Sequence, residues 1–190
     1  GDETVLAVER FDRQWVKRPD TAPRIVRIPQ EDVCQVLGMA SHEKYEAQGG
    51  PGMAQCLQVL RSSRTAPADI RHYLCAQLAF WLLAATDGHA KNFSVFIEPE
   101  GRFRLTPFYD ILSMYPAFGG RGLHPRDAKL AMGLTATKGK KYAIEQIFPR
   151  HFYQTAKAIG FEQVQMEKII SELTDNLDEV ISIVRQQLPD

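Results

Sequence analysis

The chain has 190 residues, 44% hydrophobic and 24% charged, a composition typical of a globular domain rather than of a fibrous or disordered chain. Its 23 Lys and Arg residues balance its 23 Asp and Glu residues, so bulk charge does not indicate direct nucleic-acid binding. The longest apolar stretch, residues 74–85, is shorter than a bilayer span, which predicts no membrane association. Cys34, Cys56 and Cys75 form no CxxC pair, which predicts reduced thiols in a cytoplasmic protein.

The first half of the chain predicts one strand followed by helices. Residues 4–8 are small or β-branched and predict the strand. Residues 29–37 and 53–62 predict two short helices. Residues 70–85 predict a longer helix that leads to Asp87, and its second half is apolar on nearly every face, so we expect burial all round.

The second half predicts one hairpin, one loop and one long helix. Residues 93–97 and 102–105 alternate as two short strands joined by a turn. Residues 133–141 predict a loop, and residues 161–188 carry apolar side chains at helical spacing, which predicts a single amphipathic helix. The predicted fold class is mainly α with a small β-hairpin.

Three polar residues have the spacing of a kinase active site. Asp87 precedes Asn92 by five positions, and Asp110 follows Asp87 by 23. In that arrangement the first Asp accepts the proton of the substrate hydroxyl, while the Asn and the second Asp hold Mg²⁺ against the phosphates of ATP. The predicted hairpin would bring Asn92 and Asp110 together. Lys91 could neutralise charge on the transferred phosphoryl group.

Each of these features also has a purely structural interpretation. Residues 87–88 would suit the C-terminal turn of a helix, with Asn92 as an ordinary loop residue. His89 could serve only the loop backbone, residues 9–12 could be a simple strand end, and the basic residues between 129 and 157 could form a solvated face.

Longer motifs resemble the HipA family, the serine/threonine-kinase toxins of bacterial toxin–antitoxin pairs. The segments that carry the resemblance are Val8–Arg13 (VERFDR), Ala85–Ser94 (ATDGHAKNFS), Leu105–Asp110 (LTPFYD), Lys129–Gly133 (KLAMG) and Pro149–Phe152 (PRHF). The resemblance implies the C-terminal, mostly helical lobe of a bilobed kinase-like fold. Residues 1–13 would be the hinge strand leading from an N-terminal lobe that this sequence lacks, and residues 14–190 would be the lobe itself.

The resemblance also implies a role for each residue around an ATP and Mg²⁺ site. By resemblance, Asp87 is the catalytic residue with Lys91 beside it, Asn92 and Asp110 bind the metal, Glu9 and Phe11 offer backbone contacts to adenine, Asp12 contacts ribose, and His89, Lys91 and Tyr109 lie at the nucleotide.

The family further implies partners and a cellular role. The target would be an aminoacyl-tRNA synthetase, notably the one for glutamate, whose phosphorylation stalls translation and favours drug-tolerant persister cells. The partner would be a HipB-like antitoxin, and the pair would sit on operator DNA in the bacterial cytoplasm. Lys157 matches a DNA phosphate contact, whereas Gly160 departs from the basic residue expected near it.

Two other functions remain open on the sequence. The chain could be a catalytically silent lobe that docks an antitoxin or completes a split kinase. It could also be a small-molecule phosphotransferase with the same loop spacing. The expected phosphate-covering loop and ATP-binding lysine of the N-terminal lobe do not appear before the hinge strand, so we expect this chain alone to be inactive.

Overall fold

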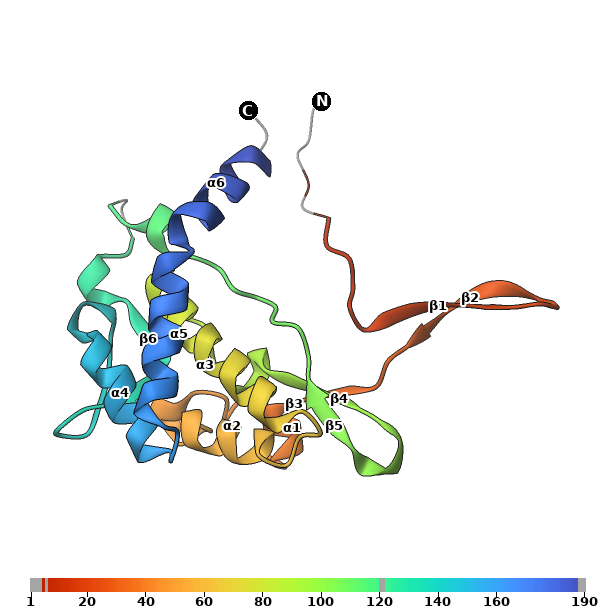
Figure 1. Cartoon of the computed structure of the whole chain (residues 1–190), viewed down its shortest axis with the longest axis horizontal. Helices are drawn as coiled ribbons and strands as arrows, with labels where there is room; N and C mark the ends of the chain where they lie inside the picture. Colours follow the sequence, from red (N-terminus) through yellow and green to blue (C-terminus); the bar gives the residue numbers. More distant parts are fainter. Residues whose placement is uncertain (1–4, 6, 120–121, 188–190) are drawn as a thin grey trace.

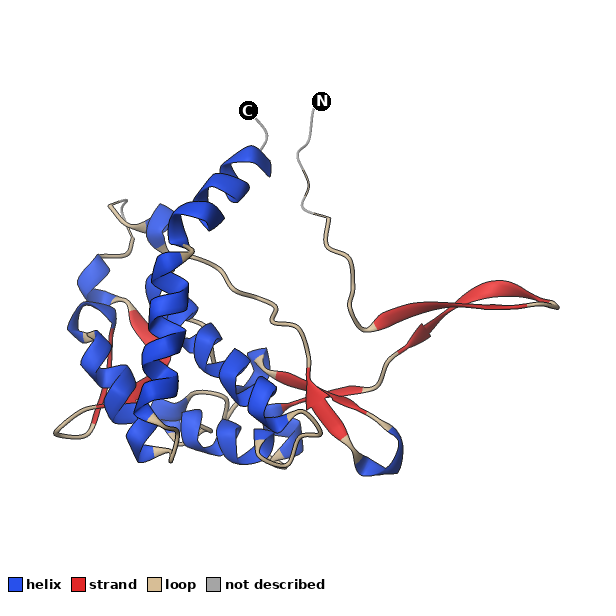
Figure 2. Cartoon of the chain, in the orientation of Figure 1, coloured by secondary structure: helices blue, strands red, loops and turns tan. Residues whose placement is uncertain are grey.

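The computed structural model describes residue 5 and residues 7–119 and 122–187. Within these residues the helices are α1 (Val33–Val36), α2 (Met53–Leu60), α3 (Ala66–Leu82), α4 (Pro149–Ala158), α5 (Gln163–Asp175) and α6 (Leu177–Gln187). The strands are β1 (Arg13–Arg18), β2 (Thr21–Arg27), β3 (Gln30–Asp32), β4 (Ser94–Ile97), β5 (Phe103–Leu105), β6 (Lys129–Thr135) and β7 (Lys140–Ala143). The predicted class is confirmed: helices form the body and the strands form three small antiparallel sheets (Figure 2).

The core lies between α2, α3, α4 and α5 (Figure 1). Tyr73 of α3 packs edge-on against Phe93 with ring centroids 4.8 Å apart, and both side chains are buried. The prediction that the second half of this helix is buried all round is wrong, because Leu82 and Leu83 are 40% and 43% exposed. The end of α3 emerges at the surface, where it delivers the loop that follows.

The predicted hairpin is confirmed and belongs to a three-stranded sheet. Strand β4 pairs antiparallel with β5, with Val95 opposite Leu105, and β3 pairs with the other edge of β4. The predicted helix over residues 29–37 is wrong in its first part, because residues 30–32 complete this sheet as β3. Only after Asp32 does α1 begin, with the Asp32 side chain accepting a hydrogen bond from the Gln35 backbone as an N-cap.

The predicted loop over residues 133–141 is confirmed only for residues 136–139 and is wrong at both ends. Strands β6 and β7 form a hairpin around this turn, with Leu134 opposite Lys141 and Thr135 opposite Lys140. Gly133, which favours a loop in the sequence, instead lies inside β6 beneath the Tyr142 ring, where a Cβ atom would lie 2.7 Å from the nearest ring carbon. The glycine is present for close packing rather than for a turn.

The single long helix predicted over residues 161–188 is divided in two. Helix α5 ends at Asp175, and the Asn176 side chain donates to the Glu172 carbonyl, 2.7 Å away, before α6 begins. Met166 and Ile169 of α5 are buried, whereas α6 buries none of its described side chains. Leu188 lies outside the described residues.

The N-terminal region differs most from prediction. Of the predicted strand at residues 4–8, Thr4 and Leu6 lie outside the described residues, and Val5, Ala7 and Val8 belong to no strand. Residues 13–27 instead form the β1–β2 hairpin, an arm that extends from the body (Figure 1).

The prediction of unpaired cysteines agrees with the structure. Cys34, Cys56 and Cys75 are free thiols. Among the described residues, no helix combines the length and the hydropathy needed to span a bilayer.

Candidate active site

The loop that carries Asp87 is shaped by the end of α3. Ala84 adopts a left-handed backbone with φ 49°, and the Ala85 N–H closes back on the Phe80 carbonyl at 2.8 Å. Gly88 packs directly on the Phe80 ring, where a Cβ atom would lie 2.8 Å from the nearest ring carbon. The glycine therefore allows the loop to lie flat on the helix, while the Asp87 side chain remains 57% exposed.

Two aromatic neighbours hold the Asp87 carboxylate. The Tyr45 hydroxyl donates to Asp87 Oδ1 at 2.8 Å, and His89 Nε2 lies 3.6 Å from the same oxygen. The Tyr45 and His89 rings meet edge-on with centroids 5.1 Å apart. The orientation of Asp87 is thus set by a residue 42 positions upstream, and no local sequence signal could have identified Tyr45.

Asn92 links the two predicted acidic residues. Its Nδ2 donates to the Asp87 backbone carbonyl at 2.8 Å and lies 3.4 Å from Asp110 Oδ2, and the residue is 5% exposed. The prediction that the β4–β5 hairpin brings Asn92 and Asp110 together is therefore confirmed. Their roles in catalysis and metal binding remain predictions.

The oxygen atoms at this point suit Mg²⁺. Nδ2 of Asn92 makes the two interactions just described, and its amide Oδ1 accepts no hydrogen bond from any described residue. Asp110, with φ 58°, adds an exposed carboxylate. An amide oxygen and a carboxylate are hard ligands, and Mg²⁺ in nucleotide sites often takes only one or two carboxylates besides phosphate and water. The residues present therefore fit the predicted metal.

Lys91 is occupied by a partner that the sequence did not indicate. Its Nζ donates to Asp32 Oδ2 at 2.7 Å, and this hydrogen bond is the main cause of its raised pKa. Its backbone carbonyl accepts a bond from the Tyr109 hydroxyl at 2.8 Å. A contact between residues 59 positions apart leaves no local pattern in the sequence. The structure places Lys91 with Asp32, and its proposed phosphate contact remains a prediction.

His89 is buried beside Asp87. It is 3% exposed, and its Nδ1 has no hydrogen-bond partner among the described residues. Loss of hydration lowers its pKa, although the nearby Asp87 carboxylate opposes the shift. A neutral imidazole follows, and the interpretation of His89 as a residue that serves the loop backbone accounts for neither nitrogen.

The residues predicted to surround adenine and ribose line one pocket of about 280 Å³. Phe11 and Tyr109 pack against one another in its lining with ring centroids 5.8 Å apart, and Glu9 and Asp12 belong to the same lining. Asp12 is buried, and hydrogen bonds from Arg10, together with its charge and that of Arg13, lower its pKa to about 2. The carboxylate is therefore ionised and paired, and any ribose hydroxyl would share its oxygens with guanidinium groups.

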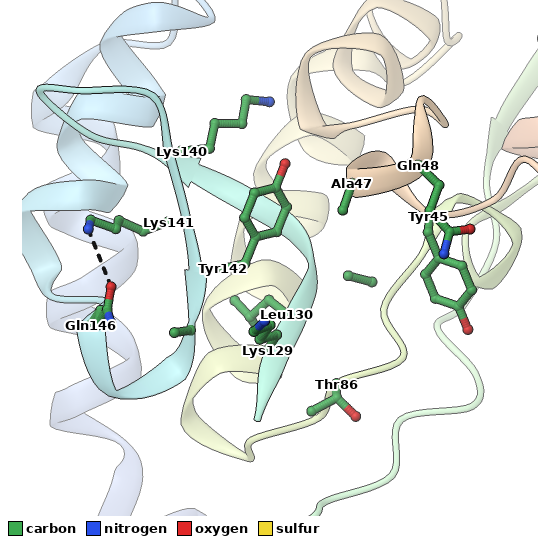
Figure 3. Close-up of a pocket in the computed structure, with 12 residues that line it drawn as sticks. Tyr45, Ala47, Gln48, Thr86, Lys129, Leu130, Lys140, Lys141, Tyr142 and Gln146 are labelled. Atoms are coloured by element: carbon green, nitrogen blue, oxygen red, sulfur yellow. Dashed lines mark hydrogen bonds between the residues drawn. The ribbon is translucent and has the colours of Figure 1, made fainter. Parts of the chain in front are cut away.

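A larger groove of about 580 Å³ opens beside Asp87. Tyr45 and Thr86 line one side and Tyr142 of β7 the other (Figure 3). Of its lysines, Lys140 is ion-paired with Glu46, and Lys141 donates to Gln146 at 3.3 Å. Lys129 has no ion pair with any described residue. The sequence does not predict this groove, because the pattern of residues 133–141 favours a loop over the strands that line it.

Lys157, the predicted DNA contact, lies apart from these features. It is exposed in the last turn of α4 and lines neither pocket. Its contact with DNA remains a prediction.

Comparison with known proteins places these features in a family. The family model described as the HipA-like C-terminal domain matches residues 1–181. "Putative kinase Y4mE" of Sinorhizobium fredii is 31% identical over 188 residues, which is 97% of this chain and 41% of that protein. The serine/threonine-protein kinase toxin HipA of Shewanella oneidensis is 31% identical over 131 residues, which is 62% of this chain and 29% of that protein.

A solved structure supports the same assignment at the level of fold. The Shewanella oneidensis MR-1 HipA chain, in its complex with HipB and operator DNA, superposes with a TM-score of 0.79 at 24% identity, over 96% of this chain and 42% of that one. The chain therefore spans about two fifths of Y4mE and of this HipA. With a family match that covers nearly its whole length, the chain belongs to the HipA family, as its C-terminal domain.

Proposed function

We propose that this chain is the catalytic lobe of a serine/threonine kinase toxin. The kinase would transfer the γ-phosphoryl group of ATP to an aminoacyl-tRNA synthetase, and we propose glutamate–tRNA ligase as that target. The observation that carries the proposal is the contact of Asn92 with both the Asp87 carbonyl and the Asp110 carboxylate. A solvent-facing turn would not need a buried amide to join two acidic residues 23 positions apart.

The chemistry assigned to these residues is positioning and proton transfer. Asp87 would accept the proton of the acceptor hydroxyl. The hydrogen bond from the Tyr45 hydroxyl occupies Oδ1 of Asp87, so Oδ2 would be the oxygen that accepts this proton. Asn92 and Asp110 would hold Mg²⁺, which when bound neutralises charge on the phosphates. Phe11 and Tyr109 would line one part of the pocket for the base.

The groove beside Asp87 is the proposed entry for the acceptor segment. Tyr45 lines the groove and also donates a hydrogen bond to the Asp87 carboxylate. The groove is large enough for several side chains of an extended peptide. A serine on that segment would approach the exposed Asp87 carboxylate from the groove.

The proposed partners are inferred from those of a relative. The HipA of Shewanella oneidensis was solved with HipB and its operator DNA, and we propose a HipB-like antitoxin and, mainly through it, operator DNA for this chain. Modification of a synthetase would halt translation and promote persistence. We also propose that an N-terminal lobe, in the same chain or supplied separately, completes the kinase.

Nucleotide binding by the chain itself gives a direct test. Isothermal titration of ATP with and without Mg²⁺ should show tighter binding with the metal, and Asp110→Asn should remove that gain. Asp127→Asn is the matched control, because Asp127 is equally exposed on a turn but lines neither the nucleotide pocket nor the groove.

Phosphotransfer tests the catalytic assignment. With the N-terminal lobe of a relative added, labelled phosphate should enter glutamate–tRNA ligase, and Asp87→Asn should reduce the rate by about 10³-fold while the melting temperature changes little. A folded Asp87→Asn protein with near-normal transfer would remove Asp87 from the mechanism. Transfer to a sugar or aminoglycoside instead of the synthetase would favour a small-molecule kinase.

A further inference from the structure

The β1–β2 arm concentrates positive charge in a chain that is neutral overall. Residues 13–27 contain five cationic side chains and one acidic side chain, Asp20. The cations are Arg13, Lys17, Arg18, Arg24 and Arg27. Figure 1 shows the arm extending away from the helical body, so this charge is presented to solvent rather than to the core.

Most of these cations have no carboxylate near them. Arg13 bonds to Asp12, and Arg27 lies 4.0 Å from the same carboxylate. Lys17, Arg18 and Arg24 form no ion pair with any described residue. Arg13 and Arg27 are directly opposed in the strand register, and the Asp12 carboxylate that both approach offsets their like charges. Lys17, Arg18 and Arg24 are therefore the cations of the arm that remain for an anionic partner.

The arm also exposes a large aromatic side chain beside the cations. Trp15 is 64% exposed and is paired across the strands with Ile25, which is 53% exposed. Because side chains alternate along a strand, Arg13, Trp15 and their partners Arg27 and Ile25 share one face. Cationic side chains on an edge strand often act only to prevent association with other strands. An exposed Trp and Ile would promote such association, so this role does not explain the composition of the arm.

We propose that this arm binds a single-stranded polynucleotide, with Trp15 stacking on a base and the cations on either side of the ribbon contacting phosphates. Aromatic side chains that alternate with cations are the usual means of binding unpaired strands, because every base offers a π-face and every nucleotide a phosphate. Paired bases in a duplex are already stacked and would leave Trp15 without a partner. The proposal does not depend on phosphoryl transfer, and its test contains no ATP.

The first experiment measures affinity and its dependence on salt. Fluorescein-labelled 20-nucleotide oligo(U), oligo(dT) and a 20-base-pair DNA duplex are titrated with the whole chain, and fluorescence anisotropy is recorded over a range of KCl concentrations. We expect both single strands to bind more tightly than the duplex. The better of the two identifies RNA or DNA as the natural ligand.

Matched charge variants locate the binding. The triple variant Lys17→Gln, Arg18→Gln, Arg24→Gln should weaken oligo(U) binding at least tenfold and reduce the slope of log K against log [salt] by about 2, or about 0.7 for each phosphate that is no longer neutralised. The control removes equal charge from exposed sites elsewhere, by Lys138→Gln, Arg150→Gln and Lys168→Gln, and should change affinity less than twofold.

Trp15 itself supplies a signal that charge alone cannot produce. The chain has two tryptophans, so Trp81→Phe leaves Trp15 as the only one, and its emission should be quenched when oligo(U) binds. Trp15→Phe should keep most of the affinity, whereas Trp15→Leu, which retains an apolar side chain, should lose about tenfold. Circular dichroism verifies that each variant is folded.

Three outcomes would overturn the proposal. Equal effects of the arm and control charge variants would place binding elsewhere. Unquenched Trp15 together with unchanged affinity in Trp15→Leu would exclude stacking. Polyglutamate that competes as well as oligo(U) would show that the arm recognises an acidic protein instead of a polynucleotide.

Discussion

Single polar residues in the interior fix the frame of the candidate site. Asp69, 6% exposed near the start of α3, accepts hydrogen bonds on one oxygen from the Ser63 hydroxyl, from the Thr65 hydroxyl at 3.0 Å and from the Leu105 N–H at 3.0 Å. The last bond ties the end of β5 to α3. Since β5 leads to Asp110 and α3 leads to Asp87, this one carboxylate helps to set the distance between the two acidic residues.

Replacing Asp69 by alanine should lower the free energy of unfolding by about 3 kcal/mol, because three donors would lose their acceptor. Urea denaturation followed by circular dichroism measures this change. Glu100→Ala is the control: Glu100 is exposed in the turn between β4 and β5, and its loss should cost less than about 0.5 kcal/mol. Similar losses in the two variants would show that the Asp69 network contributes little.

Burial of His89 should make stability depend on pH. Its folded pKa lies below the ordinary value of 6.5, so the unfolded chain binds this proton first as the pH falls. The contribution of His89 is therefore complete above pH 6.5 and is lost as the pH falls from 6.5 to the folded pKa, at up to about 1.4 kcal/mol per pH unit.

The variant His89→Gln isolates this effect. The pKa of His151 is lowered in the same direction, mainly by burial, but it is present in both proteins and cancels in the comparison. The unfolding free energy of the parent should decline more steeply between pH 7 and pH 5 than that of His89→Gln. Parallel curves over this range would contradict a neutral, buried His89.

Among the helices and strands, the sequence predicts those that have a clear local pattern. The apolar run of α3, the helix at α2 and the β4–β5 hairpin with its turn are all recognisable, and with them the meeting of Asn92 and Asp110. Strands β6 and β7 are not predicted, because Gly133 and the lysines around residue 140 are typical of a loop. In the structure, Gly133 is explained by its close packing under the Tyr142 ring. Tyr45 and Asp32 escape it because they reach the site through contacts 42 and 59 positions apart.

Helix α6 should contribute little to the stability of the chain. None of its described side chains is buried, and it meets the body mainly through α5. Ending the chain after Asn176 should change the free energy of unfolding by less than about 1 kcal/mol and the melting temperature by a few degrees at most. Differential scanning calorimetry measures both quantities.

The matched comparison lies on the preceding helix. Ile169 of α5 is 1% exposed, and Ile169→Ala should cost about 3 kcal/mol. A truncation as damaging as Ile169→Ala would show that α6 packs more closely than its exposed apolar side chains Val180 and Val184 suggest.

The whole molecule joins the proposed nucleotide pocket, an acidic pair and an open groove on a compact set of helices. The family match covers residues 1–181, while the relatives are more than twice as long. Phosphoryl transfer depends on groups that cover the phosphates as well as on the base and the metal ligands. In the proposed mechanism, the described residues contribute the base and the ligands.

We therefore expect the 190-residue chain to be folded but nearly inactive as a kinase by itself. Adding the N-terminal lobe of a relative should raise phosphate transfer to the synthetase by at least about 10²-fold, because even one stabilising donor is worth that much. The measurement is incorporation of labelled phosphate with and without the added lobe, and Asp87→Asn serves as the inactive reference. Rapid transfer by the chain alone would contradict this division of labour.

In the proposed mechanism, the backbone conformation of Asp110 sets stability against metal binding. Its φ of 58° lies in the left-handed region, where a side chain costs about 1 kcal/mol that glycine avoids. Asp110→Gly should therefore be at least as stable as the parent in thermal unfolding, Asp110→Ala should be less stable, and both should lose the Mg²⁺-dependent gain in ATP affinity. A laboratory selection for heat resistance alone would favour glycine here and produce a more robust but inactive protein. Any stabilisation effort should therefore keep residue 110 constant and screen for nucleotide binding as well as melting temperature.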